Sequence, residues 1–486
     1  MSNNAVDGLK PKLLWEHFYE LSQIPRPSKR EEKAVQFVKD YAKRNNFKYD
    51  EDKVGNVVIH VPATKGKEKA PKIVLQGHVD MVCEKNKGTK HDFDKDPITL
   101  IKDGEWIKAN GTTLGADNGI GVAAGMAVAL DKNAVHGPLE LLCTIDEETG
   151  MTGVGSLQPK FISGRILLNM DSEEDGAFYV GCSGGQDTAG VFNYELGRAK
   201  SKTEAYEVLI TGLKGGHSGL DIHQQRANAI KLLGQLLNRI EIPFQIAKIS
   251  GGSLRNAIPR EAEVILVIDP KNVRKLKKNI KDFVEDALKE YKTVDGGLTV
   301  KTKKLKEKHS KVLKKEFTDR LINALLALPH GVMAMSPDIP ELVETSTNLA
   351  ILTMDEKTLT IGTSQRSAIE SAKLNAANMV KAVLKLAGAS KLIIGDGYPG
   401  WQPNMESEIL KISKKVYKDL FNEEPEIKAI HAGLETGLLG SKYPGLDMIS
   451  FGPTIEGAHS PAERVNIKDV EKFYNILKAI LKKLAE

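Results

Sequence analysis

Five separated stretches of the sequence place histidines or carboxylates directly after apolar runs. The first, IVLQGHVD at residues 73–80, ends an apolar run with His78 and Asp80. Side chains two positions apart on a strand project to the same side, so this pair could join a metal-binding imidazole to the carboxylate that orients it. Taken alone, a hydrogen-bonded core histidine is the more common explanation. The other stretches decide between the two interpretations.

The four further stretches repeat this arrangement at the ends of other apolar elements. They contribute Asp117, Glu147 with Glu148, Asp171 and His459. Each has a structural alternative: a helix-capping aspartate, a solvated acidic loop, a strand-end turn residue and a surface histidine, in that order. Ligands gather outside the carboxyl ends of strands in open α/β sheets, so residues far apart in sequence can meet in one cleft. Because all the stretches follow one pattern, we favour a common site.

Together these residues supply two imidazoles and three carboxylates, which suits two divalent metal ions bridged by one carboxylate. The five are His78, Asp117, Glu148, Asp171 and His459. Nitrogen and oxygen ligands without thiolate favour Zn²⁺, and Co²⁺ or Mn²⁺ are also compatible. Two metals roughly 3.5–4 Å apart can generate hydroxide near neutral pH and polarise a carbonyl. One of the paired glutamates would then ligate and the other act as base, and spacing alone leaves open which does which.

The elements that must position these residues alternate between strands and helices. Helical patterns are expected near residues 8–24, 31–45 and 118–130, and apolar strands near 55–63, 71–79, 139–145 and 164–170. The helix at 118–130 consists of small residues that allow close packing on a sheet. This alternation predicts an α/β layer sandwich.

The pattern changes near residue 186, which indicates an inserted domain. From there the order is β-α-β-α-β-β-α, with a hairpin turning around Asp355 and Glu356, as expected for an α+β domain. Near Lys391 the chain is expected to return to short buried strands, KLIIGDG and LDMISFG. We therefore predict a discontinuous domain of residues 1–185 plus 395–486 and an inserted domain of residues 186–394.

Composition limits the class of protein. The 486 residues are too many for one core, and 41% hydrophobic with 27% charged residues is ordinary for a globular protein. The net charge of +5 is mild, so the lysine-rich segments are interpreted as solvated faces, with no nucleic-acid partner. Three cysteines without a C-x-x-C pair and the polar start MSNNAVDGLK favour a cytoplasmic location. The sequence contains no apolar run of about 18 or more residues, so no membrane span is expected.

The five stretches, read together, resemble the M20 family of co-catalytic di-zinc peptidases. The segments that carry the likeness are HVD (78–80), GADNG (115–119), DEETG (146–150), NMDSEE (169–174) and AHSPAE (458–463), in the family's order. Within the family, the sequence is most similar to the aminoacyl-histidine dipeptidases, a group also called cytosol non-specific or Xaa-His dipeptidases. The likeness runs from about Leu13 to the C-terminus, and it implies a three-layer zinc-peptidase catalytic domain with an inserted α+β lid domain.

The resemblance also implies a role for each residue of the common site. The metal ligands would be His78, Asp117 as the bridge, Glu148, Asp171 and His459. Glu147 would then be the general base, and Asp80 the acid that orients His78.

For the lid, the resemblance points to three further residues. GLKGGHSGLD is similar to the lid loop whose histidine stabilises the oxyanion, which implies this role for His217; a turn histidine among glycines is the alternative. RNAIP implies a substrate contact for Asn256. The strand after it, LVIDPKN, lacks the family's carboxylate-binding arginine, so Arg366 is the candidate for that role, against a surface arginine at a helix start. HAGLETG (431–437) resembles a pocket segment without an assigned role.

The function implied is hydrolysis of dipeptides, of Xaa-His and broader carnosine-like type, by a metal-activated water and a glutamate base. The alternatives are another M20 amidohydrolase, namely a tripeptide aminopeptidase or an N-acyl amino acid deacylase, and a non-catalytic peptide-binding protein on the same fold. The expected partners are a small peptide substrate and a second copy in a homodimer. Whether His217 acts within its own chain or across the dimer stays open.

Overall fold

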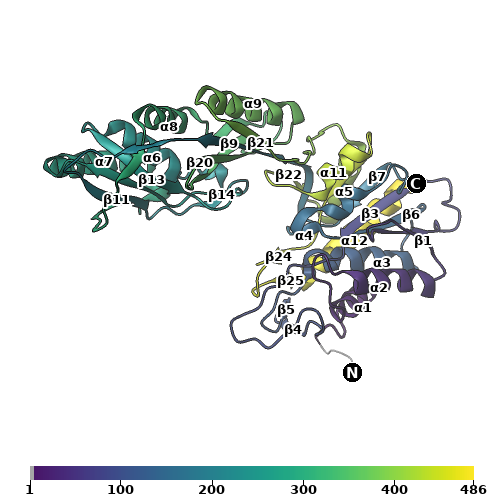
Figure 1. Cartoon of the computed structure of the whole chain (residues 1–486). Helices are drawn as coiled ribbons and strands as arrows, with labels where there is room; N and C mark the ends of the chain where they lie inside the picture. The colour runs from purple at the N-terminus through teal and green to yellow at the C-terminus, as the bar shows by residue number, and fades with distance from the viewer. Residues whose placement is uncertain (1–4) are drawn as a thin grey trace. The chain divides into compact units, whose positions relative to one another are not determined.

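The computed structural model describes residues 5–486, so the first four residues of the polar start lie outside it. The described chain forms two compact units (Figure 1). The first unit contains the residues up to Gly181, Pro403–Ala429 and Leu434–Glu486; the second contains Cys182–Gln402 and Ile430–Gly433. The expected boundaries at 186 and 394 fall a few residues inside the second unit. Bridges between Cys182 and Trp401 and between Gly185 and Tyr398 hold the extra residues there.

The first unit is built on an eight-stranded mixed sheet. Its order is β1 (Lys48–Glu51), β2 (Val57–Val61), β6 (Leu139–Thr144), β3 (Ile73–His78), β7 (Ile166–Asn169), β23 (Asp447–Ser450), β8 (Ala177–Cys182) and β22 (Glu426–Ile430). The four central strands, β6, β3, β7 and β23, are parallel to one another. Their carboxyl ends therefore meet at one edge of the sheet, and their near-continuous apolar sequences fit strands covered on both faces.

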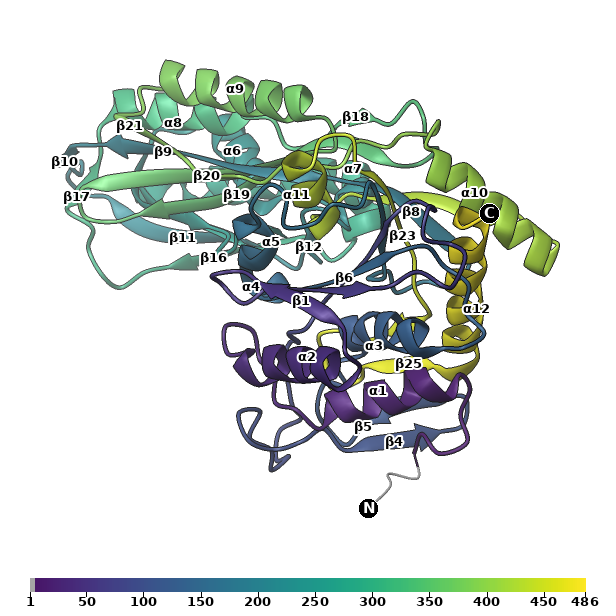
Figure 2. The ribbon, with the colours of Figure 1, turned by 90° about the vertical axis from the view of Figure 1, so that its right-hand side faces the viewer.

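Helices cover this sheet on both sides, which confirms the three-layer α/β prediction (Figure 2). On one side lie α1 (Lys12–Ser22), α2 (Glu32–Arg44), α3 (Ala116–Leu130) and α12 (Ile467–Leu484), with α10 (Glu408–Phe421) beside α12. On the other lie α5 (Thr152–Ser156) and α11 (Glu435–Lys442), and the short α4 (Glu147–Gly150) precedes α5. A small sheet completes the unit, with the order β24 (Ile455–Glu456), β25 (Arg464–Asn466), β5 (Trp106–Ala109) and β4 (Leu100–Asp103).

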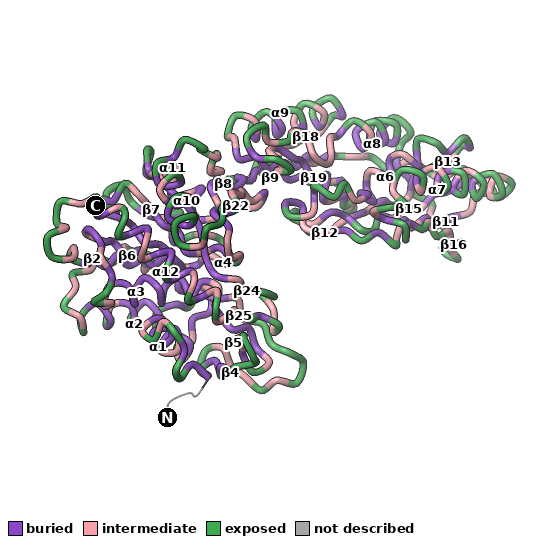
Figure 3. The backbone as a smooth tube through the Cα atoms, turned by 180° about the vertical axis from the view of Figure 1, so that it is seen from behind, coloured by how far each residue is buried: buried purple, intermediate pink, exposed green. Residues whose placement is uncertain are grey.

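The small residues of α3 let this helix lie directly against the sheet. Figure 3 shows buried residues along both α3 and β6. A Cβ atom at Gly121 would lie 2.5 Å from the carbonyl oxygen of Met170, just beyond β7, and 2.6 Å from the side-chain oxygen of Asn118. Only glycine fits this close approach of helix to strand, because real Cβ contacts are longer.

The second unit contains a nine-stranded antiparallel sheet. Its order is β16 (Thr299–Lys304), β11 (Glu204–Thr211), β15 (Ala262–Ile268), β13 (Phe244–Gly251), β19 (Val343–Met354), β20 (Thr358–Ser367), β9 (Gly184–Asn193) and β21 (Lys391–Ile394), and β18 (Gly331–Met335) pairs with β19. One face is covered by α6 (Ala229–Arg239), α7 (Val273–Asp295), α8 (Lys315–Ala327) and α9 (Glu370–Leu386) (Figure 1). The apolar faces of these helices and of the sheet form one core.

Short elements complete the second unit. Two-stranded pairs join β10 (Leu196–Arg198) to β17 (Lys311–Leu313) and β12 (Gly216–His217) to β14 (Ala257–Ile258). Two 3-10 turns span Ile222–Gln224 and Pro270–Asn272. Among residues 5–486, no helix combines the length and apolar character needed to cross a membrane.

Two local predictions for this unit have opposite outcomes. The hairpin around Asp355 and Glu356 is confirmed, because β19 and β20 pair on either side of it. The prediction that KLIIGDG is a short buried strand is wrong. This segment forms β21, which pairs with β9 at the edge of the second unit's sheet and leaves Ile393 and Ile394 exposed. Its apolar residues matched a core strand, but an edge strand has a neighbour on one side only.

His330, between α8 and β18, is a half-buried histidine held in its neutral form. Its Nδ1 atom is 3.3 Å from the side-chain amide nitrogen of Asn228 and accepts the backbone N–H of Leu349 at 3.4 Å. Burial lowers the pKa of His330 to about 4, and the nearby positive charge of Lys231 acts in the same direction. Protonation at Nδ1 would point a second N–H group of the ring at the N–H groups of Asn228 and Leu349, so the charged form is disfavoured.

We expect Gly121→Ala to destabilise the chelator-treated protein by about 1–3 kcal/mol, because the added methyl group overlaps the Met170 carbonyl oxygen. Gly155→Ala in α5 is the matched control, since a Cβ there meets no atom within 4 Å. Calorimetric melting should show a lower melting temperature for the first variant and no loss for the second. Equal melting temperatures for Gly121→Ala and the wild type would contradict the close packing of α3.

The second unit should lose stability in acid because of His330. Its folded pKa of about 4 lies below the ordinary value of 6.5, so the folded state binds fewer protons than the unfolded state. This contribution is complete above pH 6.5 and is lost as the pH falls toward 4, by on the order of 3 kcal/mol. His330→Gln should reduce the change of the urea unfolding midpoint with pH across this window. His223→Gln, which changes an exposed histidine, should leave that pH dependence as it is in the wild type. An unchanged pH dependence in His330→Gln would refute the assignment.

Candidate active site

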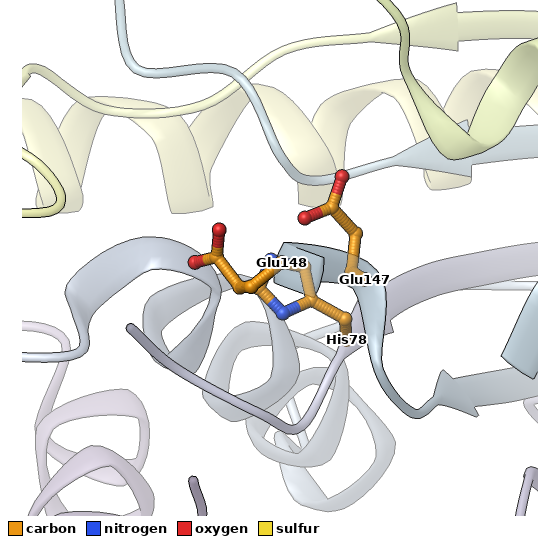
Figure 4. Close-up of side chains that lie close together, drawn as sticks. All are labelled: His78, Glu147 and Glu148. Atoms are coloured by element: carbon orange, nitrogen blue, oxygen red, sulfur yellow. The ribbon is translucent and has the colours of Figure 1, made fainter. Parts of the chain in front are cut away.

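The carboxyl ends of the parallel strands bring the predicted site residues of the first unit together. His78 is the last residue of β3, Glu147 and Glu148 open α4 after β6, and Asp171 follows β7 by two residues. Figure 4 shows His78 beside the two glutamates, whose carboxylates diverge from each other. His459 reaches the same place from the loop between β24 and β25, where its φ angle is +62°.

Asp117 occupies the centre of this group. Its Oδ1 atom lies 3.1 Å from Nε2 of His78, and its Oδ2 atom lies 3.1 Å from Nε2 of His459. Among the described residues, the hydrogen bonds of its side chain go to these two imidazoles, and none comes from a backbone N–H group of α3. The helix-capping alternative is therefore wrong, and the carboxylate faces two imidazoles instead.

A second carboxylate completes each half of the group. Nε2 of His78 lies 3.3 Å from Oδ1 of Asp171, and Nε2 of His459 lies 3.1 Å from Oε2 of Glu148. The side chains of Asp171 and Glu148 are only 6% and 4% exposed, so neither is a solvated turn or loop residue. The geometry is two halves, each an imidazole and a carboxylate, which share Asp117.

Asp80 ties His78 to the glutamate pair. Its Oδ1 atom lies 3.2 Å from Nδ1 of His78, and its oxygens accept the backbone N–H groups of Glu147 and Glu148 at 3.1 and 3.2 Å. The Ser28 hydroxyl donates a further hydrogen bond at 2.8 Å. Burial opposes ionisation of Asp80, but the bond with His78 outweighs it and lowers the pKa of Asp80. The carboxylate can thus fix both the ring and the start of α4.

The electrostatics of the group show an excess of buried negative charge. Burial raises the pKa of Asp171 to about 7 and that of Glu147 well above its ordinary value, and neighbouring carboxylates add to both shifts. Hydrogen bonds with Asp117 and Glu148 raise the pKa of His459 to about 11. Carboxylates this close and this buried are stable only when cations accompany them.

The donor atoms fit a pair of divalent cations. Those of His78, Asp117 and Asp171 lie within 4.8 Å of one another, and so do those of Asp117, Glu173 and His459. Oε1 of Glu148 and Oδ1 of Asp171 are buried without a hydrogen-bond partner among the described residues. Such unsatisfied oxygens, beside imidazole nitrogens and without thiolate, are what a zinc-type site requires.

Two glutamates near this group were not singled out from the sequence. Glu173 is the next acidic residue after Asp171 in NMDSEE; the residue is exposed, but desolvation of its carboxylate and the charges of Asp117 and Asp171 raise its pKa to about 8. Glu435, in HAGLETG, is fully buried, and its Oε2 atom accepts hydrogen bonds from Gln76 at 2.6 Å and Thr144 at 2.7 Å. The acidic run could have indicated Glu173. Glu435 is the first residue of α11, and no sequence spacing relates it to its partners on β3 and β6, so the sequence could not have indicated it.

His217 belongs to the second unit, on β12. Its Nδ1 atom accepts the backbone N–H groups of Gly219 at 3.2 Å and Leu220 at 3.0 Å, which places the proton of the neutral ring on Nε2. Burial lowers the pKa of His217, and the charge of Arg366 adds to this shift. His217 is therefore a neutral histidine that accepts two hydrogen bonds within the turn that follows it and carries its proton on Nε2.

Arg366 lies on β20 and is 7% exposed, so the alternative of a surface arginine at a helix start is wrong. It donates a hydrogen bond to the hydroxyl of Tyr398 at 2.9 Å. His431, from HAGLETG, lies 2.7 Å from the Ser346 hydroxyl, and burial together with Arg366 lowers its pKa to about 3. Asn256 is exposed beside β14, and its carbonyl accepts the N–H of Ser218.

Comparison with known proteins agrees with this geometry. Residues 74–483 match peptidase family M20/M25/M40, and the chain belongs to this family of peptidases. It is 41% identical to the cytosol non-specific dipeptidase of Escherichia coli (strain K12) over 483 residues, which cover 99% of each chain. The predicted family is therefore confirmed.

Solved structures extend the likeness to three dimensions. The chain matches the crystal structure of aminoacylhistidine dipeptidase from Vibrio alginolyticus with a TM-score of 0.92 and 42% identity, covering 98% of each chain. A tripeptidase from Staphylococcus aureus shares the fold, with a TM-score of 0.57 and 17% identity. The predicted likeness to the aminoacyl-histidine dipeptidases is confirmed.

The position of Asp117 between two imidazoles predicts the effect of its removal. Asp117→Asn should lower the zinc content of the purified protein from two ions per chain to one or none, because both halves share this carboxylate. Asp447→Asn is the matched control. This aspartate is the first residue of β23, away from the carboxyl ends of the parallel strands, and it accepts hydrogen bonds from Ser407 and Ile409. Elemental analysis measures both, and full zinc content in Asp117→Asn would exclude the bridge.

Proposed function

We propose that this chain is a cytoplasmic, homodimeric metallo-dipeptidase that hydrolyses Xaa-His and broader, carnosine-like dipeptides. The observation that carries the proposal is the arrangement around Asp117, whose two oxygens face two imidazoles that each have a second carboxylate. Two relatives that match over nearly the whole chain with 41% and 42% identity are both dipeptidases.

In this proposal His78, Asp117, Glu148, Asp171 and His459 hold two divalent ions, of which Zn²⁺ suits the donors best. When bound, such a pair supplies Lewis acidity, which brings the pKa of water toward neutrality and polarises a carbonyl. Asp80 keeps His78 in the tautomer that leaves Nε2 free for a metal, since its carboxylate faces Nδ1.

Glu147 is the general base of the proposed reaction. Its carboxylate accepts a proton from the attacking water, whose oxygen forms a bond to the scissile carbonyl carbon. Glu147 then gives this proton to the leaving nitrogen as the C–N bond breaks. Burial raises its pKa well above the ordinary value, which makes its carboxylate a stronger proton acceptor than that of an exposed glutamate.

The second unit supplies the substrate contacts in this proposal. His217 presents its Nε2 proton to the oxyanion that develops on the carbonyl oxygen, a role that suits a neutral donor. Arg366, with Asn256, binds the free carboxylate of the dipeptide, because a guanidinium can bind a carboxylate through two parallel hydrogen bonds. Tripeptides and N-acyl amino acids, the substrates of the alternative amidohydrolases, are expected to be poor substrates.

The reaction can be tested on one preparation with a substrate panel. Zinc-loaded protein should cleave carnosine and Xaa-His dipeptides faster than tripeptides or N-acyl amino acids, lose turnover with a chelator and regain it with Zn²⁺. Glu147→Gln should keep both metals and lose turnover by about 10²–10⁴-fold, the usual contribution of a general base. Glu68→Gln, at an exposed turn, is the control. Unchanged turnover in Glu147→Gln would remove it as the base, and no chelator-sensitive dipeptide cleavage would remove the function.

A further inference from the structure

Glu463 binds the backbone of the segment that carries Asp117. It is 2% exposed, and its Oε2 atom accepts the N–H groups of Leu114 at 2.7 Å and Gly115 at 2.9 Å. Its Oε1 atom accepts those of Ala116 at 2.7 Å and Asp117 at 3.3 Å. Four successive backbone donors thus converge on one carboxylate. Glu463 lies four residues after His459, so the contact joins the loops of two predicted ligands.

Arg26, in the segment after α1, binds the same segment from another direction. It is 2% exposed, and its Nη1 atom donates to the carbonyl oxygens of Val79 and Asp80, both at 2.9 Å. Its Nη2 atom donates to the carbonyl oxygen of Gly115. The rigid, planar guanidinium therefore joins the turn after His78 to the segment before Asp117.

Gly115 is bound at both ends by these two side chains, its N–H by Glu463 and its carbonyl by Arg26. Its φ angle of +71° is left-handed. A Cβ atom there would lie 2.4 Å from Nη2 of Arg26 and 2.9 Å from Sδ of Met81. The backbone can take this position because residue 115 is a glycine.

The conformation of Asp117 itself explains why such contacts are needed. Its φ and ψ angles of −79° and 112° are not helical, so the regular hydrogen bonds of α3 do not fix this residue. Yet its carboxylate must face His78 and His459 at once. Metal sites tolerate errors of only about 0.2 Å in ligand distance, so a small rotation of the segment 114–117 would separate the two halves.

We propose that Arg26 and Glu463 are positioning residues of the metal centre. By forming hydrogen bonds to the backbone of the segment 114–117 from two directions, they hold Asp117 in place relative to the segments that carry His78 and His459. Neither residue provides a ligand atom in this proposal; both act through the backbone of the ligand loops. The proposal rests on the proposed metal-binding role of Asp117, and it adds that the affinity for metal depends on residues that do not touch it.

A purely structural role is the competing explanation, and the chain offers a matched control for it. Glu140 on β6 is also buried at 1% exposure and also accepts several hydrogen bonds, from the N–H groups of Ser163 at 2.8 Å and Gly164 at 2.9 Å and from the Ser163 hydroxyl. It lies in the first half of β6, away from the strand end at Thr144. Loss of Glu140 should cost stability without disturbing the ligand loops.

The experiment compares the zinc affinity of the full-length variants Glu463→Gln and Glu140→Gln by competition with a chromophoric chelator. The melting temperature of each metal-free protein is measured alongside. Both variants should melt at lower temperature than the wild type, but only Glu463→Gln should bind zinc about 10–100-fold more weakly. Arg26→Lys, which keeps the charge but not the planar fork, should also weaken zinc binding.

Wild-type zinc affinity in Glu463→Gln would overturn the proposal, and so would an equal loss of affinity in Glu140→Gln. If Glu463→Gln does not fold, Glu463→Asp serves in the same comparison, because it keeps the charge but withdraws the carboxylate by one methylene group. Failure of the proposed function has a different signature: the wild type would bind two zinc ions without cleaving dipeptides, and the affinity comparison would still decide the roles of Arg26 and Glu463.

Discussion

The first unit depends on one constraint: several carboxylates are buried together at the end of a sheet, and their charge must be balanced. Asp117 meets this constraint most directly, because each of its oxygens lies 3.1 Å from an imidazole nitrogen. The pKa shifts have the same origin, since burial favours the neutral form of Asp171 and Glu147, while the carboxylates favour the charged form of His459. In the proposed function a pair of divalent cations balances this charge, and the side chains around Asp117 supply donor atoms close enough together to hold them.

The parallel strands and the loops around them divide this task. Strands β3, β6 and β7 bring His78, the glutamate pair and Asp171 to one edge, because parallel strands end on the same side of a sheet. Asp117 lies in the non-helical first turn of α3 and His459 in the loop between β24 and β25, so the ladder of the sheet fixes neither of them. Buried charged side chains replace the ladder there, since charge-assisted hydrogen bonds to backbone groups are stronger than neutral ones.

The second unit is built on a different principle. Its antiparallel sheet and the helices on one face bury a core of their own. Three of its histidines are held toward the neutral form, because burial lowers the pKa of His217, His330 and His431. Neutral imidazoles suit hydrogen-bond donation, and Arg366 carries the positive charge beside two of them. One unit thus concentrates negative charge and metal-ligand atoms, whereas the other supplies neutral donors and a guanidinium.

The sequence by itself determined the layered α/β fold, the hairpin at Asp355 and the family, because these depend on local periodicity and on short motifs in a fixed order. It also pointed to His78, Asp117, Glu148, Asp171 and His459, since each follows an apolar element. It left undecided which buried groups lie around them, and it placed KLIIGDG wrongly, because an apolar run does not say whether a strand has one neighbour or two. Only the tertiary structure decided the contacts of Arg26, Glu435 and Glu463, because these hydrogen bonds join residues 53 to 359 positions apart and such pairs leave no periodicity in the sequence. The neighbours of each of these side chains are set by how distant segments fold together.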